Sequence, residues 1–101
     1  MNYQKIILAG EITNEPVIQK TKEGVLCQLK FEMTVMHFSD KVIFPVILTY
    51  VMYDIDGQEA VKGREVLVEG IIVIDKNGKF TVRADWMEKG SMVKEKVNDL
   101  F

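Results

Sequence analysis

Apolar and polar residues alternate along most of this chain. The alternation is clearest from Val25 to Met36, where every second residue is apolar and most of the residues between them are polar. A strand with one buried face produces this pattern, because successive side chains point to opposite sides of the strand. We therefore predict a long strand whose core-facing side chains are Val25, Cys27, Leu29, Phe31, Met33 and Val35.

The segment from Gly63 to Met87 predicts a hairpin of two further strands. Its turn contains Asn77-Gly78, the dipeptide that adopts positive φ most readily between two strands. Gly70 interrupts the first of these strands, which indicates a bulge or bend that lets a small sheet curl into a barrel. On the return strand, one parity is apolar and predicts that these side chains face the core: Phe80, Val82, Ala84 and Trp86.

Three more segments have the character of strands. Lys5 to Ile12 contains Gly10, again at a point where a barrel strand must bend, and Val17 to Thr21 is a shorter strand. Val42 to Tyr53 is long and apolar, and Pro45 within it should lie at a sheet edge or a bulge because it lacks a donor.

The order of these segments predicts one all-β domain. With only a short connector over 54–62, the long segments have the strand count of a five-stranded oligonucleotide-binding (OB) fold barrel, although an SH3-like barrel or a small sandwich fits the same pattern. We place this domain at 1–88. Residues 89–101 are predicted to form a C-terminal tail, as a frayed helix or flexible segment.

Composition limits the possible functions. The chain has 101 residues and a formal net charge of −2, so any binding to nucleic acid must come from a local basic patch. A single cysteine, with no signal sequence ahead of it, is typical of the reducing cytoplasm. The longest apolar run, 42–51, is about half the length that a membrane helix needs, so we expect no membrane association.

Four segments of the sequence resemble the motifs of a known protein family. The segments IILAGEITNEPV, VLCQLKFEMTV, KGREVLVEG and KNGKFTVRADWM together resemble the bacterial single-stranded-DNA-binding protein family over most of residues 4 to 87. The short connector and the runs LCQLKFEM and FPVILTY are also similar to primosomal replication protein N, a dimeric relative that assists replication restart. The most specific part is Lys62-Gly63 with Val66, Val68, Glu69 and Gly70.

This resemblance implies a non-enzymatic cytoplasmic protein that binds single-stranded DNA on one face of its barrel. It also implies a homodimer or homotetramer that acts in replication, restart or the maintenance of mobile elements, together with replication or helicase proteins. We expect no cofactor, metal or catalysis, because the sequence has no paired carboxylates, glycine-rich phosphate loop or metal-spaced ligands.

Candidate DNA-binding residues combine cations for the phosphates with rings for the bases. Lys30 lies on the polar face of a long strand, Lys41 adjoins Phe38 in a loop, and the other cations flank two predicted hairpin tips. The resemblance adds Phe44 and a displaced Tyr50 as rings. The full set is Lys20, Lys22, Lys30, Phe38, Lys41, Phe44, Tyr50, Lys76, Lys79 and Arg83.

Each candidate also has a simpler interpretation. Lys30 shares its face with Glu32, as in an ordinary solvated sheet, and lysines at hairpin tips often serve solubility alone. Phe38 could instead close the mouth of the barrel.

A rival function is an adaptor that binds DNA weakly or not at all and docks a protein, or its own copy, through the apolar hairpin segment 71–74. The terminal Asn98-Asp99-Leu100-Phe101 is weakly similar to the partner-recruiting acidic tip of the family. Only Asp99 and the terminus carry negative charge, so an ordinary tail is the preferred explanation.

Overall fold

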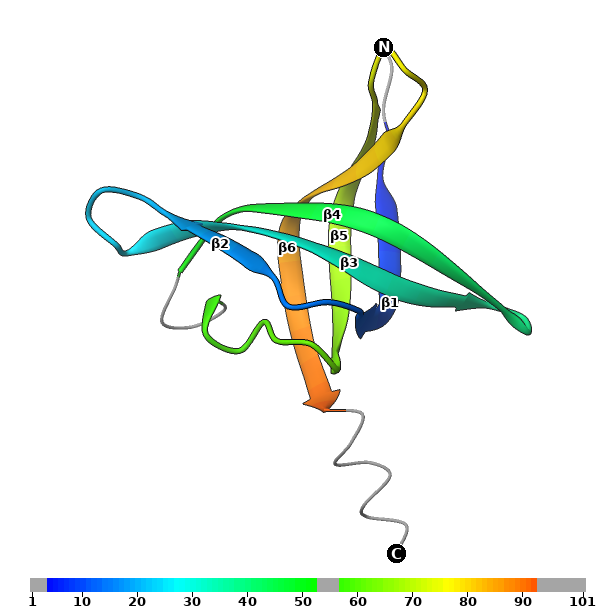
Figure 1. Cartoon of the computed structure of the whole chain (residues 1–101), viewed down its shortest axis with the longest axis horizontal. Helices are drawn as coiled ribbons and strands as arrows, with labels where there is room; N and C mark the ends of the chain where they lie inside the picture. Colours follow the sequence, from blue (N-terminus) through cyan, green and yellow to red (C-terminus); the bar gives the residue numbers. More distant parts are fainter. Residues whose placement is uncertain (1–3, 53–56, 93–101) are drawn as a thin grey trace, which may run out of the picture.

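The chain folds into a closed barrel of β-strands (Figure 1). The structure, a computed structural model, describes residues 4–52 and 57–92. Five strands form the ring in the order β1-β5-β6-β4-β3, and a pairing of β3 with β1 closes it. The short β2 is added to the outer edge of β3. The strands are β1 (Ile6–Ile12), β2 (Val17–Lys20), β3 (Leu26–His37), β4 (Asp40–Met52), β5 (Arg64–Ile74) and β6 (Phe80–Met92).

The predicted five-stranded all-β barrel is therefore confirmed. Its pairings are antiparallel except for β4 with β6, which run parallel over Val46–Leu48. Pro45 pairs with Glu32 of β3 and directly precedes this parallel ladder. Among the described residues, no strand pairs with the other side of β4 before Val46, so Pro45 lies at a sheet edge, as predicted.

The inner side chains of the ring form a single core. The predicted inward set of β3 is confirmed from Cys27 to Met33, and Val35 packs against this core as a partly buried residue. Val25 was predicted wrongly: it precedes β3, in the turn after β2, and is 51% exposed. The buried core is Ile12, Cys27, Leu29, Phe31, Met33, Val46, Leu48, Ala60, Val66, Val68, Val82, Ala84 and Met87.

Two glycines allow the strands to approach one another at the bends. A Cβ at Gly70 would lie 2.0 Å from the carbonyl oxygen of Arg83 on β6. A Cβ at Gly10 would lie 2.2 Å from the carbonyl oxygen of Thr34, next to the β1–β3 pairing that closes the barrel. Backbone atoms cannot move away from such contacts cheaply, so both predicted bends depend on glycine.

The predicted burial of Trp86 is wrong because β6 contains a bulge. Gly70 pairs with Ala84 whereas Glu69 pairs with Trp86, so Asp85 is an extra residue in β6. A bulge reverses the inward and outward parity of every residue after it. Met87 consequently faces the core, and Trp86 lies on the outer surface with 44% exposure.

The last strand also extends further than expected. β6 continues to Met92, so four residues assigned to the tail, 89–92, belong to the barrel. The expectations for Tyr53 and for the tail over 93–101 lie outside the described residues. Within the part that the structure describes, no helix has the length and apolar character needed to span a bilayer.

Candidate nucleic-acid interface

The outer wall of the barrel carries a row that alternates cationic and apolar residues. Ile47 on β4 pairs with Lys30 on β3 and with Arg83 on β6. Arg83 in turn pairs with Ile71 on β5. Residues that pair directly point to the same side of a sheet, and the neighbours Phe31, Val46 and Val82 are buried, so this row faces outward. With strands ~4.8 Å apart, Lys30 and Arg83 are separated by roughly 10 Å across the wall.

A shallow groove of about 300 Å³ runs beside this row. Val17, Pro45 and Ile47 give it an apolar floor, while Lys30 and Glu32 contribute charges. The backbone amide of Glu32 donates to the Asn14 side-chain oxygen at 2.9 Å, which fixes the loop before β2 against β3. The wall thus offers apolar area and positive charge side by side, with Glu32 as the opposing charge.

Phe38 forms the tip of the β3–β4 hairpin. The two-residue turn Phe38-Ser39 joins the paired residues His37 and Asp40. Phe38 is 91% exposed, and its ring contacts the His37 imidazole edge-on at a centroid distance of 4.8 Å. Its φ of 58° is one that a bulky residue rarely adopts. A two-residue hairpin turn requires positive φ, so the turn itself accounts for this conformation. The exposed ring does not close the mouth of the barrel, and Lys41, which was expected in the same loop, lies in β4 and pairs with Met36.

The other candidate cations lie at separate hairpin tips. Lys76 and Lys79 belong to the β5–β6 turn, where the Asp75 carboxylate accepts the backbone amides of Asn77 and Lys79 at 2.8 and 3.0 Å. Gly78 has a φ of +80°, which confirms the predicted turn. Lys20 and Lys22 lie at the β2–β3 hairpin. The three hairpins project in different directions (Figure 1), so the structure brings together Lys30 and Arg83 but not all seven cations.

The structure describes the side chain of Phe44 but not that of Tyr50, the two remaining predicted rings. Phe44 pairs with Met33 on the core side of the wall and packs edge-on against Phe80, at a centroid distance of 5.6 Å. This geometry favours Phe44 as a core residue rather than as a base platform. Tyr50 lies in β4, and its side chain is not among those that the structure describes.

Reasoning from the sequence missed Ile47. It links the two cations of the row, yet it lies in an almost continuous apolar run in which inward and outward residues look alike. Only its pairing with Lys30 and Arg83, which the sequence does not give, shows that Ile47 points outward. Among the residues that the structure describes, no group of His, Cys, Asp or Glu is arranged to hold a metal ion.

Solved structures with the same arrangement of strands include single-stranded-DNA-binding proteins. No family model matches the sequence, and a search of curated proteins finds no match. The second single-stranded-DNA-binding protein of Mycobacterium smegmatis superimposes with a TM-score of 0.69 at 17% identity, over 84% of this chain and 86% of that one. The chain therefore has the OB fold. The dimeric N-terminal domain of PriB from Thermoanaerobacter tencongensis superimposes with a TM-score of 0.64 at 17% identity, over 86% of this chain and 96% of that one.

A third structure shows the same fold within a longer protein. The single-stranded-DNA-binding protein of Thermus aquaticus gives a TM-score of 0.69 at 22% identity, and the match covers 88% of this chain but 41% of that one. The OB fold predicted from the sequence is thus confirmed. At these identities the likeness concerns the fold, and function has to be argued from this chain's own residues.

Proposed function

We propose that this protein binds single-stranded DNA without catalysis and with little sequence preference, in replication, restart or the maintenance of mobile elements. The observation that carries this proposal is the outward row Lys30–Ile47–Arg83 on an OB-fold barrel. The buried thiol Cys27 fits a reducing cytoplasm as the site of action.

In the proposed complex, Lys30 and Arg83 contact phosphates of one strand as it crosses β3, β4 and β6. The apolar floor of the groove then faces sugars and bases, and Phe38 provides an exposed ring for stacking at the end of the β3–β4 arm. Stacking on an aromatic ring contributes ~1–3 kcal/mol per base and tolerates any base, because every base has a π-face. Sequence tolerance follows from this use of charge and apolar area.

We further propose that the protein is a homodimer formed through β1. One edge of β1 pairs with β5 from Ile6 to Glu11, whereas the other edge pairs with β3 only at Glu11 and Ile12. Within the described residues, 6–9 therefore present an open edge that a second β1 could extend, and Ile7 on it is 58% exposed. The dimeric state of the PriB domain supports a dimer rather than a tetramer.

The experiment that tests DNA binding is a titration of fluorescently labelled oligo-dT, followed by anisotropy, at low and moderate salt. We expect saturable binding that weakens as salt rises, because bound cations are released from the strand. If no binding occurs even at low salt, the adaptor function of the 71–74 hairpin becomes the better account. Light scattering coupled to size-exclusion chromatography separates monomer, dimer and tetramer.

A further inference from the structure

Trp86 lies on the outward face of β6, next to the proposed DNA wall. Ala84 and Met87 are buried on the opposite face of the strand. Arg83 and Trp86 are exposed, and roughly 7–10 Å of strand separates them across the bulge. Trp86 therefore extends the outward surface of the wall at its β6 end.

The bulge is the feature that brings this ring to the surface. In a regular strand, residue 86 would share the inward parity of Ala84. The extra residue Asp85 reverses that parity, and bulges are frequent next to active sites, where they re-aim a side chain. The indole is consequently 44% exposed, although folded proteins bury most of the surface of their tryptophans. A large ring held outward in this way is typical of a contact surface.

Ile71 on β5 forms an apolar platform together with this ring. It pairs with Arg83, while the preceding outward residue of β5, Glu69, pairs with Trp86. Ile71 is therefore the diagonal neighbour of Trp86, and such neighbours lie about 7–8 Å apart, within reach of an aromatic side chain. Ile71 is itself 41% exposed. The platform thus presents a ring and an aliphatic side chain beside a cation, the combination used in binding single strands.

The charges near the platform allow a base to lie on it. Glu69 lies beside Trp86, but its side chain is only 25% exposed and forms an ion pair with Lys5. Asp85 is exposed in the bulge and opposes a phosphate placed directly over it, whereas Arg83, two residues earlier, attracts one. An uncharged base can therefore cover the ring while its phosphate stays at Arg83.

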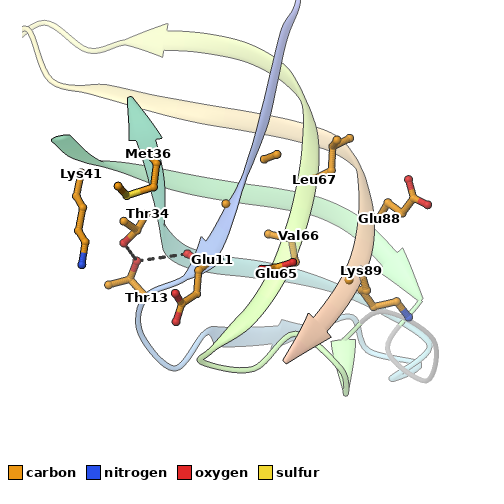
Figure 2. Close-up of a pocket in the computed structure, with 13 residues that line it drawn as sticks. Glu11, Thr13, Thr34, Met36, Lys41, Glu65, Val66, Leu67, Glu88 and Lys89 are labelled. Atoms are coloured by element: carbon orange, nitrogen blue, oxygen red, sulfur yellow. Dashed lines mark hydrogen bonds between the residues drawn. The ribbon is translucent and has the colours of Figure 1, made fainter. Parts of the chain in front are cut away.

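The character of the face changes beyond Trp86. The next outward residue of β6 is Glu88, which pairs with Leu67. Both line a hollow of about 790 Å³ between this face and the β3–β4 arm (Figure 2). Glu88 is exposed, and its carboxylate disfavours a further phosphate at this point. The surface that suits a DNA strand therefore ends at Trp86.

We propose that Trp86 stacks on a base of the bound single strand. This inference rests on the proposed function, since Lys30 and Arg83 hold the phosphates that lead the strand to the ring. Bases over β3 and β4 face the apolar groove. The base after the Arg83 phosphate turns to the other side of the row and stacks on the indole, with Ile71 against its edge. β6 lies two strands from the β1 edge of the proposed homodimer, so edge pairing leaves the platform uncovered.

The test uses Trp86 as its own reporter, because it is the one tryptophan of the chain. Unlabelled oligo-dT is titrated into the unmodified protein while tryptophan emission is followed, and anisotropy of labelled oligo-dT gives the affinity independently. We expect a saturable quenching of the emission with the same dissociation constant as the anisotropy rise. An anisotropy rise without quenching would overturn stacking on Trp86 and leave DNA binding intact. If neither signal changes, the proposed function fails and this site fails with it.

Two variants at position 86 separate stacking from apolar contact. Trp86→Phe keeps an aromatic ring and should bind oligo-dT within about threefold of the unmodified protein. Trp86→Leu keeps apolar area without a π-face and should bind about tenfold more weakly. The slope of log affinity against log salt should stay unchanged in both, because no phosphate contact is lost. Equal affinities of the two variants, or a shallower slope for Trp86→Leu, would contradict stacking.

A matched pair on β5 locates the platform. Ile71→Thr should weaken oligo-dT binding about threefold, because it removes apolar area beside the ring. Ile74→Thr is the same change on the opposite face of β5, at a residue that is 66% exposed and pairs with Phe80, and it should leave the affinity unchanged. Melting temperatures confirm that both variants are folded. Equal effects on binding would contradict a platform at Ile71 and Trp86.

Discussion

Lys30 and Arg83 are both cross-strand partners of Ile47, one from β3 and the other from β6. They are 53 residues apart in the sequence, 83 minus 30, and meet only because β4 pairs antiparallel with β3 and parallel with β6. This relationship turns two isolated surface cations into one positively charged wall.

Removing both cations tests whether this wall contacts phosphates. In Lys30→Ala/Arg83→Ala, oligo-dT affinity should fall about tenfold or more, which corresponds to about 1.4 kcal/mol. The slope of log affinity against log salt should become shallower by about 1.4, because each lost contact with a single-stranded phosphate removes about 0.7. Anisotropy titrations across a salt series measure both quantities.

The matched control removes a cation elsewhere. Lys62 is exposed in the connector that leads into β5, away from the wall. Lys62→Ala should leave both the affinity and the salt slope nearly unchanged. An equal loss in this control would show that the barrel attracts DNA through its overall charge and not through the row.

Replacing Phe38 should stabilise the fold but weaken the binding of DNA. Its φ of 58° costs about 1–2 kcal/mol for a residue with a side chain, whereas glycine adopts this conformation freely but loses more entropy on folding. Phe38→Gly should therefore raise the free energy of unfolding by about 0.5 kcal/mol while it weakens oligo-dT binding by about 1 kcal/mol or more. Denaturant unfolding and anisotropy measure the two effects, and stronger or unchanged binding would remove Phe38 from the site.

The bend at Gly70 should be intolerant of any side chain. Gly70→Ala places a Cβ 2.0 Å from the Arg83 carbonyl oxygen and 2.7 Å from the Ala84 Cα. The free energy of unfolding should therefore fall by about 3 kcal/mol. Gly24→Ala is the control, because its Cβ meets no atom within 4 Å and only the φ of +73° is unfavourable, which costs about 1 kcal/mol. Chemical denaturation of both variants checks the difference, and equal losses would contradict the close approach of β5 and β6.

The bulge in β6 predicts unequal losses of stability at two neighbouring positions. Met87→Gln buries an amide in the core and should cost about 2–3 kcal/mol of stability. Trp86→Gln changes an outer-surface residue and should cost less than about 1 kcal/mol. Thermal and chemical unfolding of the pair gives the comparison. If Trp86→Gln lost more stability than Met87→Gln, Trp86 would face the core, as the uninterrupted alternation of the sequence predicts, and the bulge would be contradicted.

The contrast between Trp86 and Leu29 shows what sequence reasoning can reach. Leu29 lies in a strand with regular alternation, so its parity alone predicts its burial correctly. Trp86 follows an extra residue, and the glycine that signals this irregularity, Gly70, lies on the partner strand and not on β6. The barrel and its turns were therefore predictable, whereas the side to which residues after the bulge point was not.

The binding site was less predictable than the fold for a similar reason. Side chains at hairpin tips, such as Phe38 and Lys79, can be located from turn signals alone. The wall depends on registers between strands that are distant in sequence, and Ile47 could not be assigned to it from a run that is apolar on both sides. Phe44 fails as a base platform in the structure because its pairing with Met33 turns it toward the core.

The most direct test of the central claim is the anisotropy of labelled oligo-dT titrated with the unmodified protein at two salt concentrations. The wall of Lys30 and Arg83 predicts a saturable rise at low salt that moves to higher protein concentration when salt is raised. A flat anisotropy signal at low salt, from protein shown to be folded, would contradict DNA binding by this barrel.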